Sequence, residues 1–124
     1  MIELLPDLPA DTVGIRASGQ VDSADYETVL VPAVESVLKE HGKVRLLYQI
    51  GNDFTGFTAG AMWDDMRLGL AHLGAWEKVA VVTDVGWVAH AASLFRFAMP
   101  FPLRVFPLED RAAAEAWLAS GPPS

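Results

Sequence analysis

The sequence contains no cysteine among its 124 residues. This absence excludes disulfide bonds, thiolate metal sites and cysteine nucleophiles. The chain is nevertheless long enough to bury a hydrophobic core without covalent cross-links, and its length is typical of one domain. We therefore predict a single domain over residues 1–120, followed by a frayed tail at 121–124.

Basic residues are also scarce. Nine lysines and arginines stand against 16 aspartates and glutamates, which gives a formal net charge of −7. A generic nucleic-acid surface needs clustered lysine and arginine side chains. The sequence has no such cluster, so we do not expect nucleic acid as a partner.

Long apolar runs are missing as well. A membrane-spanning helix needs roughly 18 consecutive apolar residues, and the most apolar segment, 87–99, is interrupted by His90, Ser93 and Arg96. The first eleven residues carry acids and prolines where a signal peptide has a basic region and an apolar run. These patterns predict a cytoplasmic protein without integral membrane association.

Hydrophobic periodicity predicts strands that alternate with helices. Such an order forms a mostly parallel sheet through right-handed crossovers, whereas a short turn at 6–9 makes the first two strands antiparallel. The predicted fold class is α/β, with a mixed sheet of about five strands covered by about four helices. The strands are expected at 2–5, 12–20, 44–50, 78–83 and 103–106, and the helices begin at Asp22, Thr58, Gly86 and Glu109.

Several local features extend this prediction. Pro32 lies inside the first helix and is expected to kink it, and residues 51–57 are expected to form a loop. The adjacent Asp64 and Asp65 diverge by about 100° on a helix and are predicted to lie on a solvated face. The apolar stripe of the second helix comprises Trp63, Met66, Leu70 and Leu73, and the four tryptophans at 63, 76, 87 and 117 are expected to anchor the core.

The segment 51–60 is rich in glycine and precedes a helix. Glycines let a backbone approach a ligand, and helix N-termini favour anions. The segment has neither a Walker A nor a dinucleotide-binding glycine pattern. It is therefore either a binding loop or an ordinary turn with Phe54 and Phe57 packed into the core.

The segment 87–99 is unusually apolar for a surface helix, since ten of its thirteen residues are Trp, Val, Ala, Leu, Phe or Met. Its excess apolar surface can face a homodimer partner, the core of the domain or a bound apolar ligand. His90 and Ser93 are one turn apart and Asp84 is nearby in sequence, but the chain has no nucleophile elbow, and a serine on the same helix as its base is poorly placed for hydrolysis. We therefore expect no catalytic residue and no enzyme activity.

Three segments of the chain resemble the SpoIIAA-like family of small bacterial proteins, which is grouped with STAS domains and the SEC14-like lipid-binding fold. The resemblance covers about residues 2–119 and implies a STAS-like α/β fold. The segments are Val21-Asp22-Ser23-Ala24-Asp25-Tyr26, then Trp76 to Asp84 with Trp87, and Leu103-Arg104-Val105-Phe106 leading to Ala116-Trp117-Leu118.

The STAS relatives that antagonise anti-sigma factors carry a phosphorylatable serine in an Asp-Ser-Ser-Gly motif. The corresponding segment here is Phe57-Thr58-Ala59-Gly60, which makes Thr58 a candidate regulatory phosphorylation site. Phe57 replaces the acid of that motif, and Ala59 replaces its second serine.

The sequence thus predicts a non-enzymatic STAS-like interaction or regulatory module. It would act as a homodimer or with an unidentified protein partner, through loop 51–58 and helix 87–99. The alternative is a SEC14-like carrier or sensor of a small apolar, lipid-like ligand. No cofactor is expected, and no metal, since Asp53, Asp64 and Asp65 lack a calcium-loop pattern. The candidate ligand or partner surface comprises Phe54, Phe57, Trp63, Trp87, His90 and Phe95.

Overall fold

The strands form one five-stranded sheet in the order β1-β2-β3-β4-β5. β1 runs antiparallel to β2, and the other neighbouring pairs are parallel. A computed structural model describes residues 1–72 and 74–120. The elements are β1 Ile2–Leu4, β2 Thr12–Val21, α1 Ser23–Asp25, the π-helical turn η1 Tyr26–Leu30, α2 Val31–His41, β3 Val44–Phe57, α3 Ala59–Ala71, β4 Trp76–Thr83, α4 Gly86–Ala98, β5 Leu103–Phe106, the 3₁₀ turn η2 Leu108–Asp110 and α5 Arg111–Ala119.

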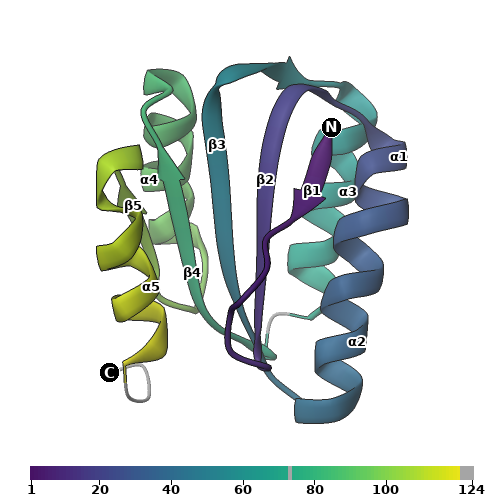
Figure 1. Cartoon of the computed structure of the whole chain (residues 1–124). Helices are drawn as coiled ribbons and strands as arrows, with labels where there is room; N and C mark the ends of the chain where they lie inside the picture. The colour runs from purple at the N-terminus through teal and green to yellow at the C-terminus, as the bar shows by residue number, and fades with distance from the viewer. Residues whose placement is uncertain (73, 121–124) are drawn as a thin grey trace.

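Helices cover both faces of the sheet (Figure 1). The main core lies between one face and α2, α3 and α4, which contribute Val34, Leu68 and Val88. A smaller core lies on the other face, where α5 contributes Ala114 and Leu118. The α/β fold with a mixed, mostly parallel sheet is therefore confirmed. The predicted tail at 121–124 lies outside the described residues.

The first predicted helix is divided by a π-helical turn. Asp22 caps it as expected, and its side chain and that of Asp25 each accept a backbone N–H bond from the other residue. The irregularity in this helix is η1, which ends just before α2; a kink at Pro32 itself stays a prediction. Pro32 then lies in the first turn of α2, where its missing N–H costs little. Gly42 ends α2 in a left-handed conformation, as predicted.

The loop predicted at 51–57 is wrong, because β3 continues to Phe57. The added residues pair with the end of β2 through two register shifts. Gly19 and Gly56 have positive φ values of 56° and 147°, so glycine allows these irregular pairs where other residues would be strained. The glycines that suggested a turn instead let the strand bend and remain paired.

The described helices also bear on the membrane prediction. None of those in residues 1–72 and 74–120 is long and apolar enough to cross a bilayer.

Candidate functional site

Helix α3 turns its apolar stripe away from the core. Its inner side buries only Ala61 and Leu68, which is a small contact for 13 residues. Trp63, Met66 and Leu70 of the predicted stripe therefore face outward, and the fourth member, Leu73, lies outside the described residues. Trp63 is 61% exposed rather than a core anchor. The large exposed side chains of α3 are Met62, Trp63, Met66 and Leu70.

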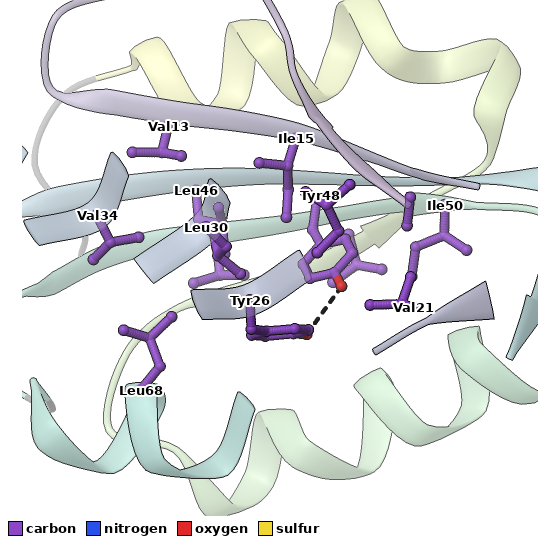
Figure 2. Close-up of a cluster of buried hydrophobic side chains, with 14 of the residues drawn as sticks. Val13, Ile15, Val21, Tyr26, Leu30, Val34, Leu46, Tyr48, Ile50 and Leu68 are labelled. Atoms are coloured by element: carbon purple, nitrogen blue, oxygen red, sulfur yellow. Dashed lines mark hydrogen bonds between the residues drawn. The ribbon is translucent and has the colours of Figure 1, made fainter. Parts of the chain in front are cut away.

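The inner side of α3 carries carboxylates instead. The Tyr26 hydroxyl donates a 2.8 Å hydrogen bond to Asp65 Oδ1 and lies 2.9 Å from the hydroxyl of Tyr48. Because Tyr26 gives its only proton to Asp65, Tyr48 must donate to Tyr26. Figure 2 shows the two phenols meeting within the buried cluster. The structure thus joins α3 to the sheet through a chain of three polar side chains.

The prediction that both aspartates are solvated is wrong for Asp64 and incomplete for Asp65. One carboxylate oxygen of Asp64 is buried without a hydrogen-bond partner among the described residues. Asp65 as a residue keeps exposed surface. Burial of its carboxylate nevertheless raises the pKa of Asp65, and the hydrogen bond from Tyr26 offsets only part of this rise. Burial, together with the charge of Asp65, raises the pKa of Tyr26, so this phenol acts as a neutral donor.

Helix α4 also shows apolar side chains to solvent. Its inner side buries Val88 and Ala92, whereas Leu94 and Phe97 are 68% and 80% exposed. An open hollow of about 270 Å³ lies on the opposite side of α4 from its buried residues, as expected from helical spacing. The hollow is lined by Ala89, His90, Ser93, Leu94 and Phe97.

An aromatic cluster joins the end of β3 to the start of α4. The ring centroids of Phe54 and Phe57 are 4.8 Å apart, and Trp87 lies 5.9 Å from Phe54 and 6.2 Å from Phe57. Phe54 is buried, whereas Trp87 is half-exposed and is therefore not the core anchor that was expected. The two segments predicted to share a surface, 51–58 and 87–99, do meet through these rings.

The six candidate surface residues therefore fall into separate groups. Phe54, Phe57 and Trp87 form the cluster, and His90 lines the hollow. Trp63 lies on α3, and Phe95 is an exposed residue of α4 outside both features. The sequence interpretation missed Leu94 and Phe97 as surface residues, although their spacing from His90 on one helix face could have indicated them. It also missed Met62, Met66 and Leu70 because it assigned the α3 stripe to the core.

Thr58 is the N-cap of α3, as predicted. Its hydroxyl oxygen accepts a 3.1 Å hydrogen bond from the backbone N–H of Ala61. The start of α3 is packed closely against α1, since a Cβ on Gly60 would lie 2.3 Å from Ser23 Oγ. A larger residue at position 60 would therefore require the Ser23 hydroxyl to move. A phosphorylation role for Thr58 remains a prediction.

Metal ligands do not gather in the part of the chain that the structure describes. No group of three or more histidine or acidic side chains in residues 1–72 and 74–120 is placed to hold a metal ion.

Comparisons with known proteins point to one family. A sequence model described as SpoIIAA-like matches residues 12–119. The fold is similar to the crystal structure of an uncharacterized DUF3478-family protein with a SpoIIAA-like fold from Shewanella loihica PV-4. The two share 28% sequence identity with a TM-score of 0.76, over 95% of this chain and 93% of the other. No curated protein matches the chain.

Proposed function

The chain belongs to the SpoIIAA-like family, and we propose that it is a non-enzymatic STAS-like module that binds a second copy of itself. Its binding surface is the apolar face, by which we mean the exposed large side chains of α3 and α4. These are Met62, Trp63, Met66, Leu70, Trp87, Leu94, Phe95 and Phe97.

One observation carries this proposal. Ten large hydrophobic residues are exposed in the described chain, and eight of them lie on α3 and α4. Scattered exposed hydrophobic residues are normal, but a concentration on two helices is typical of an interaction surface. Large side chains bury roughly 150–250 Å² each when covered. Each helix therefore exposes on the order of 500 Å² of apolar side-chain surface. This area is close to that of the largest apolar patch on a typical monomer.

The charges of the two helices favour a protein partner over a lipid surface. Helices that bind anionic membranes have a polar side rich in lysine and arginine. Arg67 and Arg96 are the only lysine or arginine residues in α3 and α4, and Asp64 and Asp65 offset them. A neutral apolar face within a chain of net charge −7 is better suited to protein contact.

A second candidate function, carriage of a small apolar ligand, is supported by a different observation. On the three-helix face, Tyr48 of β3 and Val81 of β4 keep 7% and 8% exposure, whereas Ile15 of β2 and Val34 of α2 are fully buried. The sheet is thus covered less tightly beneath α3 and α4 than beside α2. An apolar ligand would enter at this looser part of the core.

Sedimentation equilibrium at several concentrations tests the proposed function. We expect the wild type to form a reversible dimer and Leu94→Glu to weaken association by at least about tenfold, because a buried unpaired carboxylate is costly. Leu4→Glu is a matched control, since Leu4 is 57% exposed but lies on β1, at the opposite edge of the sheet from β5. This variant should dimerise like the wild type.

Native mass spectrometry and vesicle flotation separate the alternatives. A monomer that retains an additional small-molecule mass would contradict the proposal and favour the carrier. A monomer that floats with phosphatidylcholine vesicles would show that a lipid surface occupies the apolar face. A dimer that Leu94→Glu and Leu4→Glu leave equally intact would place the interface elsewhere.

A further inference from the structure

We infer that α4 is the centre of the dimer interface and packs antiparallel against α4 of the second copy, around a two-fold axis beside Ser93 and Leu94. This inference rests on the proposed function. It adds which helix forms the interface, how the two copies are oriented and which residues lie at the axis.

The outward side of α4 carries both a hollow and the side chains that can fill one. Ala89 and Ser93 are small residues that line the hollow. Leu94 and Phe97 border the same hollow and are the two most exposed large hydrophobic residues described in the chain. A two-fold interface brings the same patch together from both copies, so it requires this kind of self-complementarity.

Helical spacing determines which residues meet. Residues of an α-helix rise about 1.5 Å each along the axis. In an antiparallel pair with its two-fold axis between positions 93 and 94, Phe97 of one copy lies opposite His90 of the other. The Phe97 ring of each copy then enters the hollow of its partner, and Ser93 lies beside the axis, where a small side chain allows close approach.

The distribution of charge along α4 suits a contact between two acidic copies. Two chains of net charge −7 repel each other, and carboxylates buried at their contact would increase this cost. No aspartate or glutamate occurs from Val85 to Leu108, and Arg96 is the only lysine, arginine or acid in α4. α4 is therefore where two acidic copies approach without facing carboxylates on the contacting helix.

The length of α4 sets the expected strength of the contact. Its 13 residues span about 20 Å. An interface centred on one helix of this length lies at the small end of specific protein interfaces. We therefore expect a dimer that dissociates on dilution rather than a permanent one.

Cysteine cross-linking tests the inference, because the chain has no native cysteine. A Ser93→Cys substitution places two thiols beside the axis, where the Cα atoms fall within the range of about 4.4–6.8 Å that a disulfide spans. Ser36→Cys is the matched control, on an exposed position of α2. Met66→Cys places a thiol on the exposed side of α3 and tests whether that helix forms the interface instead. Each variant is oxidised at a concentration that gives dimers and analysed on a non-reducing gel.

We expect a covalent dimer from Ser93→Cys, a yield at least tenfold lower from Ser36→Cys, and no disulfide-linked dimer from Met66→Cys. A dimer by sedimentation that Met66→Cys links and Ser93→Cys does not would overturn the α4 interface and leave the proposed module intact. A dimer that none of the variants links would also overturn it. A monomer at every concentration would overturn both the interface and the proposed homodimer.

Discussion

Tyr26 is the residue through which the polar side of α3 is joined to the core. It is 1% exposed and lies in η1, yet its hydroxyl contacts Asp65, 39 positions further along the chain, and Tyr48 on β3. A buried hydroxyl without a partner costs more than a hydrogen bond gains. Each of the three side chains therefore stabilises the fold only when its hydrogen-bond partners in the chain are also present.

Replacement of Tyr26 tests this chain of hydrogen bonds. Tyr26→Phe should lower the free energy of unfolding by about 1–3 kcal/mol, because it leaves the buried Tyr48 hydroxyl and the Asp65 carboxylate without partners. Tyr48→Phe should cost less, about 0.5–1.5 kcal/mol, since Tyr26 can still donate to Asp65. Urea unfolding at pH 7 measures both. Equal losses, or a larger loss for Tyr48→Phe, would contradict the direction of the bonds.

At the scale of the element, α3 has the reverse of the usual polarity of a helix that covers a sheet. Such a helix places its apolar stripe inward and its charges outward. Here Trp63, Met66 and Leu70 face outward, and the two aspartates lie near Ala61 and Leu68 on the inner side. The core contact of α3 is correspondingly small. The hydrogen bond from Tyr26 to Asp65 favours this orientation, together with the burial of Ala61 and Leu68.

The two neighbouring aspartates should respond to the same substitution with opposite signs. Asp64→Leu should stabilise the fold by about 1 kcal/mol, because it removes a buried carboxylate oxygen that has no hydrogen-bond partner. Asp65→Leu should destabilise it by about 1–3 kcal/mol, because the Tyr26 hydroxyl loses its acceptor. Thermal unfolding of both variants checks this. A loss of stability in both would mean that α3 needs two inward carboxylates.

At the scale of the whole molecule, the two helical layers differ: α5 is bonded to one face of the sheet, whereas α3 and α4 on the other face expose apolar side chains to solvent. Arg45 of β3 donates to the backbone carbonyls of Leu118 and Ser120, and Lys78 of β4 donates to that of Trp117. These bonds hold the end of α5 against its face of the sheet. The apolar face is on the opposite, three-helix side, so the proposed partner approaches there.

Salt concentration tests the balance between apolar contact and overall charge. Each copy carries −7, and raising ionic strength from about 0.1 M to 1 M shortens the screening length from about 10 Å to 3 Å. The dissociation constant of the dimer, measured by sedimentation equilibrium, should fall several-fold at high salt. The reason is that salt screens the repulsion between the two copies, whereas an apolar contact has no ion pairs to lose. Weaker association at high salt would indicate an interface built on ion pairs.

The sequence by itself determined the order of the elements and most of their ends. Alternation and helical spacing are local, so strands such as β4 and caps such as Asp22, Gly42 and Thr58 could be predicted from neighbouring residues. The prediction failed at 51–57, because glycine marks a bulged strand as readily as a turn. Only pairing with β2, far along the chain, decided between the two.

Tertiary structure alone decided the candidate site. An apolar stripe indicates that one side of a helix is hydrophobic, but it does not indicate whether that side contacts the core, a partner or solvent. Trp63 and Leu70 were therefore assigned to the core in error. The Tyr26 and Asp65 contact and the packing of Phe54 against Trp87 join residues more than 30 positions apart. No local pattern encodes such contacts, because they form only when the sheet brings its strand ends and helices together.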